Sequence, residues 1–326
     1  MVKLGFIGAG QMAEDHMKTI QAIEHAEITA IVDTNQERAA HIAKTYGAVS
    51  YATAEELLDS GKVDAVYLCT PPFARSGLEE AAVSRGIHLL AEKPVGLQLE
   101  EAQRNEQIVL KSGVIHSSGY CLRYLNIVQQ AKAYLQDKQI DLVLACRLGS
   151  LPPLTWWSKI ELSGGQLVEQ STHQLDLIRY LAGEFQSVQA VHALRSAMLK
   201  SDPAATAYDA GTVSFTLQSG AVGNITSSSL VRHGGRSGVE FYGDGFFVSI
   251  FGNELRIVDD SQDVTVRSSE DFYLLQNTAF VEAIRTGNQQ LIRGDYSEAV
   301  STLAVTLAAN ESAAAQGQPI VLAQRG

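Results

Sequence analysis

Two glycines near the start of the chain have the spacing of a phosphate-binding turn. The segment Gly8-Ala9-Gly10-Gln11-Met12-Ala13 reads GxGxxG with alanine in the last place. Gly8 permits a tight turn, Gly10 lets the backbone approach a pyrophosphate, and the small Ala13 lets a helix pack closely on a strand. A helix that begins here points its free N–H groups at the phosphates. The pattern predicts that Gly8, Gly10, Gln11 and Met12 bind a dinucleotide.

Asp33 is the acidic residue that such a site needs. It lies 20 residues after Ala13, at the end of the next apolar run, where a carboxylate accepts hydrogen bonds from the adenosine ribose. A carboxylate there repels a 2′-phosphate, so we expect NAD as the cofactor. Arg38 lies nearby and keeps NADP open as the less favoured cofactor. The alternative is a structural turn in which Asp33 caps a helix.

Two proline-containing motifs follow later apolar runs. They are Cys69-Thr70-Pro71-Pro72 and Ala91-Glu92-Lys93-Pro94. Ligands of open α/β sheets bind at the carboxyl ends of the strands, so we expect both motifs to face the cofactor. The ammonium of Lys93 either binds a substrate oxygen near the nicotinamide or forms a surface pair with Glu92. The residues assigned to cofactor binding here are Thr70, Pro71, Pro72, Glu92 and Lys93.

The elements that must position these residues alternate between strand and helix. Apolar runs at 3–7, 27–32, 64–70, 87–91 and 114–118 alternate with helix-forming segments at 12–24, 36–46, 54–59, 73–85 and 99–111. This alternation predicts an α/β Rossmann domain, a doubly wound parallel sheet with helices on both faces, over residues 1–120.

The second half of the chain has a different pattern. Short runs of strand character, from 142–148 through 264–266, are separated by tight turns such as Gln218-Ser219-Gly220. They predict an α+β domain with a large, mainly antiparallel sheet over residues 121–326. A closing helix is expected at about 295–316, where Asp295 and Glu298 resemble a capping box. We expect this helix to pack back on the first domain.

A helix expected at 172–182 carries a histidine among other polar residues. His173, Asp176 and Tyr180 fall on one face of this helix, which is typical of a catalytic site and equally of a solvated surface. His16, His25 and His41 are assigned to helices of the first domain and are expected at its surface.

Composition excludes several classes of partner. The 326 residues carry 25 basic and 36 acidic side chains, and the net charge of −11 argues against nucleic acid or an anionic membrane as a partner. Cys69, Cys121 and Cys146 form no CxxC pair, so neither a disulfide framework nor a zinc site is expected. The chain shows neither a secretory leader nor a long apolar run, and we expect a cytoplasmic location.

These motifs together resemble those of the Gfo/Idh/MocA family, which contains glucose–fructose oxidoreductase and inositol dehydrogenase. The glycine turn, Asp33, Thr70-Pro71-Pro72 and Glu92-Lys93-Pro94 occur in the family's order. Residues 164–176 are similar to the family's GGGxLxDxGxHxxD segment, and residues 280–287 to its F-x-x-A-I-x-x-G helix. Residues 299–319 resemble its closing helix.

The resemblance implies an NAD(P)-dependent oxidoreductase, with a C-terminal sheet that forms a homodimer or homotetramer. Carried over by position, the catalytic residues are Lys93, Glu169 and His173. Glu169 replaces the family's aspartate, and Ser171 replaces its glycine. Arg75 stands where many members have a histidine, and we expect it on the surface of a helix rather than near the nicotinamide.

Aromatic and basic residues of the crossover and the second domain are candidates for a substrate cleft. Aromatic rings stack on the apolar faces of sugars, and arginine binds hydroxyls or carboxylates. The alternative for these side chains is packing between domains. The loop from Arg232 to Arg236 either binds an anion or forms an oligomer contact. The residues assigned to substrate binding are Tyr120, Arg123, Trp156, Trp157 and Asp176.

The resulting hypothesis is reversible hydride transfer between a CH–OH carbon of a sugar or polyol and NAD. His173 is predicted to act as general base on the alcohol, and Lys93 to stabilise negative charge on the same oxygen. Glu169 is predicted either to orient His173 or to bind a neighbouring hydroxyl. No metal is expected. Two alternatives remain: an NAD-dependent glycosidase without net redox turnover, and a non-catalytic dinucleotide-binding sensor.

Overall fold

The computed structural model describes residues 1–323, and these form two compact units. The first unit contains residues 1–124 and 271–300, and the second contains residues 125–270 and the chain from 301 onward. The expected boundary at residue 120 lies close to the first crossover. The helix at 272–286, however, belongs to the first unit, although the sequence analysis assigned it to the second domain.

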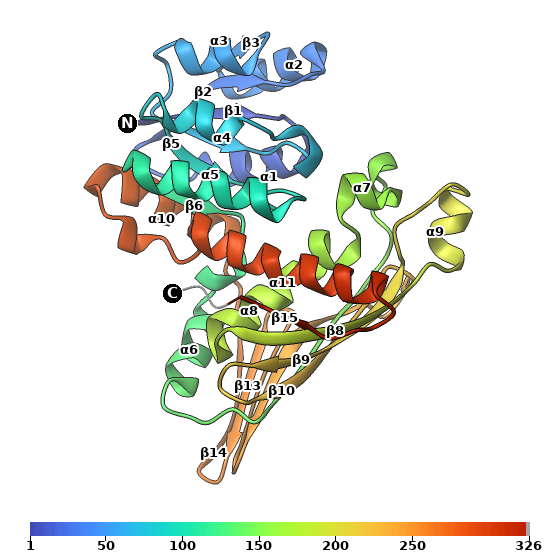
Figure 1. The fold of residues 1–326 in the computed structure, drawn as a ribbon. Helices are drawn as coiled ribbons and strands as arrows, with labels where there is room; N and C mark the ends of the chain where they lie inside the picture. The colour runs from blue at the N-terminus through green and yellow to red at the C-terminus, as the bar shows by residue number, and fades with distance from the viewer. Residues whose placement is uncertain (324–326) are drawn as a thin grey trace. The chain divides into compact units, whose positions relative to one another are not determined.

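The first unit is built on a parallel sheet whose six described strands have the order β3-β2-β1-β4-β5-β6 (Figure 1). This order is that of a dinucleotide-binding Rossmann fold, so the predicted doubly wound sheet is confirmed. The strands are β1 (Val2–Ile7), β2 (Ala26–Val32), β3 (Val49–Tyr51), β4 (Ala65–Leu68), β5 (His88–Ala91) and β6 (His116–Ser118). The helices are α1 (Gln11–Ile20), α2 (Gln36–Tyr46), α3 (Ala54–Asp59), α4 (Leu78–Val83), α5 (Leu99–Ser112) and α10 (Phe272–Thr286).

Both faces of this sheet are covered, which explains its nearly continuous apolar strands. All four residues of β4 are buried. On one face, Met17 of α1 and Phe280 of α10 pack in the same core as Ile31 of β2. Strand β3 was not predicted from the sequence, because it is short and carries no apolar run; Val49 is exposed and the other two residues are only partly buried.

The second unit is built on a sheet whose nine described strands have the order β14-β13-β12-β11-β7-β10-β9-β8-β15. Its described pairings are antiparallel except for the parallel pair β7 and β10, as the mainly antiparallel prediction requires. The strands are β7 (Leu142–Leu148), β8 (Phe185–Ala193), β9 (Ala210–Leu217), β10 (Val222–Ser228), β11 (Arg236–Gly243), β12 (Phe246–Phe251), β13 (Glu254–Asp259), β14 (Gln262–Arg267) and β15 (Ile320–Val321). The helices are α6 (Asn126–Leu135), α7 (Ile160–Ser163), α8 (Thr172–Ala182) and α9 (Ser196–Ser201).

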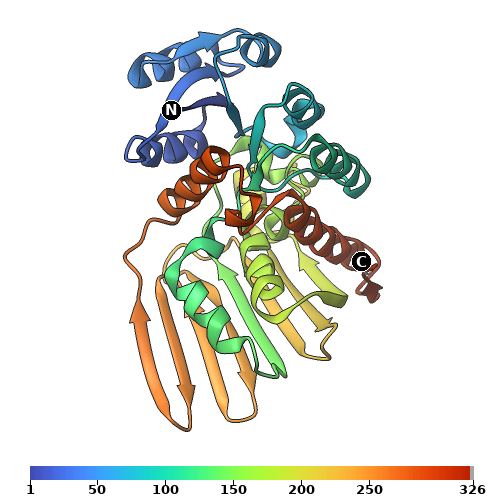
Figure 2. The ribbon, with the colours of Figure 1, turned by 90° about the vertical axis from the view of Figure 1, so that its left-hand side faces the viewer.

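Helices α6 and α8 lie against one face of this large sheet (Figure 2). Along β7, Val143 and Ala145 point to that inner face and are buried, whereas Leu142 and Leu144 point to the outer face and are exposed. This alternation with a period of two is what a sheet covered on one side requires.

The closing helix α11 (Tyr296–Ala314) contains the boundary between the two units, since residues 296–300 belong to the first and the remainder to the second. The Glu298 N–H donates to Asp295 Oδ1 at 2.9 Å, so the side-chain cap expected from the sequence is confirmed. Among the described helices, none is both long and apolar enough to cross a membrane.

Candidate functional site

The glycine turn between β1 and α1 leaves room for a phosphate. Gly8 has a φ of +94°, and a Cβ at this position would lie 2.7 Å from the Cys69 carbonyl oxygen. A Cβ on Gly10 would meet nothing within 4 Å, and Gly10 caps α1 without a side-chain hydrogen bond. The first N–H groups of α1 therefore face an open space, which suits the anionic phosphates of a dinucleotide.

Asp33 lies at the carboxyl end of β2, where the sequence predicted the ribose-binding residue. Its Oδ2 accepts a 2.7 Å hydrogen bond from the Ala9 N–H, and its Oδ1 pairs with Arg38 at 2.6 Å. Burial opposes its ionisation, yet the hydrogen bonds from Arg38, Ala9 and Asn35 hold the pKa of Asp33 below its ordinary value. Asp33 is thus a stable carboxylate that joins the glycine turn to the edge of the predicted ribose site.

Arg75 is buried, so its expected place on a helix surface is wrong. Its side chain is 2% exposed, and its guanidinium donates to the backbone carbonyls of Glu92 and Pro94, the latter at 2.9 Å. It also donates to the carbonyl of Thr70 at 3.1 Å. A single planar cation thereby joins the TPP loop after β4 to the EKP loop after β5.

Glu79 is the carboxylate that faces this buried guanidinium. Glu79 Oε1 lies 3.9 Å from Arg75 Nε and accepts a 3.4 Å hydrogen bond from the Tyr296 hydroxyl. Burial dominates over the attraction of Arg75 and raises the pKa of Glu79 to about 7. The cation that joins the two loops thus has a counter-ion that titrates near neutral pH.

His16 is also buried, which corrects the surface assignment. It has no exposed surface, and its Nε2 lies 2.9 Å from Glu92 Oε1 of the EKP motif. Its Nδ1 lies 2.9 Å from Asn277 Oδ1 on α10. Two further histidines were assigned to surface helices. His41 is exposed on α2, as expected, but His25 precedes β2 and is not on a helix.

The hydrogen-bond network fixes the protons on His16. The Thr19 hydroxyl donates to the His16 carbonyl, so it accepts from the Asn277 amide at 2.8 Å, and this turns the Asn277 carbonyl toward the ring. His16 Nδ1 must then donate, and Nε2 shares a proton with Glu92. The Lys93 N–H donates to the other Glu92 oxygen, so both carboxyl oxygens of Glu92 have a partner in this network. This pair holds the residue that precedes Lys93.

The remaining cofactor residues lie around the same sheet edge. Thr70 follows β4, and its buried hydroxyl has no hydrogen-bond partner among the described residues. A buried hydroxyl at a strand end is able to donate a hydrogen bond to a ligand there. Pro72 is buried and begins a short 3₁₀ turn. Gln11 is exposed at the start of α1, and Met12 accepts a contact from the Tyr273 hydroxyl at 3.0 Å.

The proposed catalytic residues of the second half lie on a π-helical turn and on α8, which follows it directly. Glu169 is buried in the turn Leu167–Ser171, and His173 is half-buried in the first turn of α8. Gly165, with a φ of +86°, precedes the turn, and a Cβ there would lie 2.6 Å from the Tyr208 ring. π-Helical turns are rare and frequent at functional sites. Lys93, in contrast, belongs to the first unit.

The polar face of α8 is packed, so the solvated-face alternative is wrong. Asp176 is 1% exposed and accepts a 3.1 Å hydrogen bond from Thr302 of α11. The Tyr180 hydroxyl accepts a 3.0 Å hydrogen bond from Gln129 of α6. These contacts give Asp176 a structural role, and its substrate contact stays a prediction.

Most of the other residues assigned to substrate have structural contacts within their own unit. Arg123 is buried, pairs with Glu298 at 2.9 Å and donates to the Arg293 carbonyl at 2.8 Å. Trp157 packs in an apolar cluster with Met198, while Trp156 is half-buried beside it. Tyr120 is 1% exposed. These contacts give Arg123 and Trp157 structural roles within their own units; packing between domains and the substrate contacts stay predictions.

The sequence analysis missed His16 and underrated Arg75. The burial of His16 could have been predicted from its spacing, because it lies on the same face of α1 as Ala13, Met17 and Ile20, which are all buried. Gly119 is a second missed residue, since a Cβ there would lie 2.5 Å from Glu92 Oε2.

No group of three or more possible metal ligands occurs among the described residues.

A parallel sheet of this strand order, with an open glycine turn and a carboxylate after β2, defines a dinucleotide-binding protein. Known families match both halves. The model described as an oxidoreductase family with an NAD-binding Rossmann fold covers residues 2–120, and the GFO/IDH/MocA C-terminal domain covers residues 128–246. The chain belongs to the Gfo/Idh/MocA family of NAD-binding oxidoreductases, as the sequence motifs indicated.

Individual relatives agree with this assignment. The chain is 26% identical over 312 residues to the myo-inositol 2-dehydrogenase of Thermotoga maritima, covering 90% of this chain and 91% of that protein. It shares its fold with the WlbA dehydrogenase from Bordetella pertussis, solved with NADH and UDP-GlcNAcA, at a TM-score of 0.85, 23% identity and 99% coverage of both chains. Levoglucosan dehydrogenase, solved with NADH and levoglucosan, gives a TM-score of 0.89 at 21% identity, over 99% of this chain and 100% of that one.

The raised pKa of Glu79 predicts a pH-dependent loss of stability. Because the pKa of Glu79 in the folded protein, about 7, lies above its ordinary value of 4.5, the contribution of Glu79 to stability is complete below about pH 4.5 and is lost as the pH rises through 7. Glu79→Gln removes this dependence. The free energy of unfolding measured in urea should therefore rise for the variant relative to the wild type between pH 5 and pH 8. Glu80→Gln, an exposed neighbour, is the control; a parallel shift in both variants would contradict the assignment.

Removing His16 should destabilise the protein strongly, because it leaves the buried Glu92 carboxyl without one of its hydrogen-bond partners. We expect His16→Ala to lower the free energy of unfolding by about 3 kcal/mol. His41→Ala, on the exposed side of α2, should change it by less than about 0.5 kcal/mol. In the His16→Ala background, Glu92→Gln should recover part of the loss in urea unfolding. Fully additive effects would show that the two side chains do not interact.

Proposed function

We propose that this protein transfers a hydride reversibly between a CH–OH carbon of a sugar or polyol and NAD. The observation that carries the proposal is the sheet edge of the first unit, where Asp33 joins the open glycine turn and a buried ionic network holds the residue before Lys93. Its family membership and the sugar or polyol substrates named for its relatives support the same class of reaction.

Each residue has a distinct part in the proposal. Gly8, Gly10, Gln11 and Met12 would hold the pyrophosphate, Asp33 the ribose, and Thr70, Pro71 and Pro72 the nicotinamide side. NAD, when bound, supplies the hydride acceptor. Lys93 would bind the alcohol oxygen and stabilise its developing negative charge, and His173 would take the hydroxyl proton. Glu169 would orient His173. The Asp33 carboxylate disfavours a 2′-phosphate, although Arg38 beside it leaves NADP as the minor alternative.

We also propose a homo-oligomer that forms through the outer face of the large sheet. Leu144 and Leu142 of β7 are 37% and 36% exposed on that face, and Val222 of β10, in register with Leu142, is 50% exposed. Val191 of β8 is 63% exposed on the same face. An apolar sheet face of this kind is typical of a protein interface.

The three cysteines are free, which supports a location in the reducing cytoplasm.

Lys93→Ala is the test of the proposed chemistry. NAD reduction should be followed by NADH absorbance over a panel of polyols and sugars, to find the preferred substrate of the wild type. We expect Lys93→Ala to lower kcat/KM on that substrate by roughly 100-fold, because a charge-stabilising group is lost. Lys18→Ala, an exposed lysine of α1, is the matched control.

Other outcomes of that assay would overturn the proposal. Undiminished turnover by Lys93→Ala would remove the assigned role of Lys93. Hydrolysis of glycosides without NADH release would indicate the glycosidase, and tight NAD binding without any turnover would indicate the sensor.

The oligomer prediction is tested by charge on the outer sheet face. Leu144→Lys combined with Val222→Lys should reduce the mass measured by light scattering after gel filtration to a smaller assembly, since two cations would be desolvated in the interface. Val264→Lys on β14, at an exposed position on the opposite face of the sheet, is the control and should leave the mass unchanged. A monomeric wild type would contradict the proposal.

A further inference from the structure

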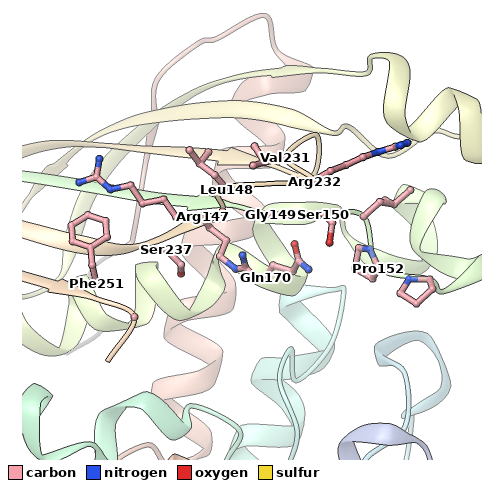
Figure 3. A pocket seen from close by; sticks show the side chains of 15 residues that line it. Arg147, Leu148, Gly149, Ser150, Pro152, Gln170, Val231, Arg232, Ser237 and Phe251 are labelled. Carbon is pink, nitrogen blue, oxygen red and sulfur yellow. The ribbon is translucent and has the colours of Figure 1, made fainter. Parts of the chain in front are cut away.

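A basic cavity lies within the second unit, at the ends of β7, β11 and β12. Its volume is about 750 Å³, within the range of small-molecule sites. Fifteen residues line it, and they include Arg147, Arg232 and Arg236 but no aspartate or glutamate (Figure 3). In a chain with a net charge of −11, a cavity whose charged lining residues are all arginines is a local reversal of charge.

Arg147 is the central cation of this cavity. It follows Val143 and Ala145 at alternate positions of β7, so it points to the inner face of the sheet, where the helices pack. Figure 3 shows its side chain reaching toward Gln170. Burial lowers the pKa of Arg147, and no ion-pair partner for its guanidinium is found in the described part of the chain. A half-buried guanidinium without a counter-ion is costly, and an anionic ligand would offset that cost.

The backbone around Arg147 leaves space for this guanidinium. A Cβ on Gly149 would lie 2.7 Å from Arg147 Nη1, so any larger residue there would push the cation aside. Gln170 precedes His173 by three residues, and it belongs to the turn that carries Glu169. The cavity is therefore lined by the same segment that supplies the proposed catalytic residues of this unit.

The other two arginines differ from Arg147. The Arg236 guanidinium lies 4.2 Å from the Phe251 ring centroid and 3.4 Å from Glu240, so its charge is already shared. Arg232 is exposed and extends away from Arg147 in Figure 3. These two residues add to the positive potential at the rim, and Arg147 alone has the position of a direct ligand.

We propose that this cavity binds the anionic group, a phosphate or a carboxylate, of a sugar substrate, with Arg147 as its principal ligand. The inference rests on the proposed function for the sugar part and adds that the preferred substrate is charged. A guanidinium binds either group through two parallel hydrogen bonds, and Gln170 provides a neutral amide beside it. A neutral polyol would leave the Arg147 charge without a partner. The Arg232–Arg236 loop is thereby assigned to anion binding rather than to an oligomer contact.

Calorimetry on the full-length protein tests this site. Glucose 6-phosphate, glucuronate and glucose are the probes, with and without NAD. We expect at least one of the two anions to bind about tenfold more tightly than glucose, and the stronger of them identifies the anionic group. Arg147→Gln should weaken binding of that anion about tenfold and leave glucose unchanged, while Arg147→Lys should retain part of the affinity. Arg267→Gln, an arginine of β14 paired with Glu254, is the charge-matched control.

The failure of this inference can be told apart from failure of the proposed function. Equal affinities for all three probes, or equal losses in Arg147→Gln and Arg267→Gln, would overturn the anion site while leaving hydride transfer intact. A change in assembly mass in Arg232→Gln, together with unchanged anion affinity in Arg147→Gln, would assign the loop to an oligomer contact and would equally overturn the anion site. Anion binding that depends on Arg147, in a protein that reduces no NAD with any sugar, would preserve the site and refute the function.

Discussion

A carboxylate buried at the end of β5 is the constraint on which the first unit depends. Glu92 is only 4% exposed, so its charge requires partners inside the protein, and His16 and the Lys93 N–H supply them. His16 is itself positioned by Asn277, which comes from α10, far away in the sequence. Helix α10 thus belongs to the nucleotide-binding unit for an electrostatic reason as well as an apolar one. The lysine of the EKP motif follows directly from this anchored residue.

The loops at the carboxyl edge are organised by a second buried charge. Prolines at 71, 72 and 94 provide no N–H groups, so these loops have few backbone donors of their own. Arg75 compensates by donating to carbonyls of both loops. Arg147 of the second unit differs from Arg75, since it has no counter-ion among the described residues. Arg75 uses its charge to fix the backbone, whereas the charge of Arg147 is available to a ligand.

The sequence predicted the fold well and the supporting network poorly. Apolar runs and the GxGxxA turn were sufficient for the parallel sheet, because strand burial on both faces leaves a direct trace in composition. His16 and Arg75 were assigned to the surface because a polar residue on a helix is usually solvated. Their partners, Glu92, Asn277 and the strand-end carbonyls, are brought to them only by tertiary packing. The Arg232–Arg236 loop was recognised as a possible anion site, but the part of Arg147 could not be predicted, because the cavity is lined by four separate segments.

The protonation of His16 is the most direct test of this account. Neutron diffraction from a deuterium-exchanged crystal at neutral pH would locate the protons of the imidazole and of Glu92. We expect deuterium on Nδ1 of His16, facing the Asn277 carbonyl, and a second deuteron between Nε2 and Glu92 Oε1. A bare Nδ1, with the Asn277 amide nitrogen turned toward it, would contradict this arrangement, because the chain of hydrogen bonds from Thr19 through Asn277 to His16 and Glu92 would then run differently.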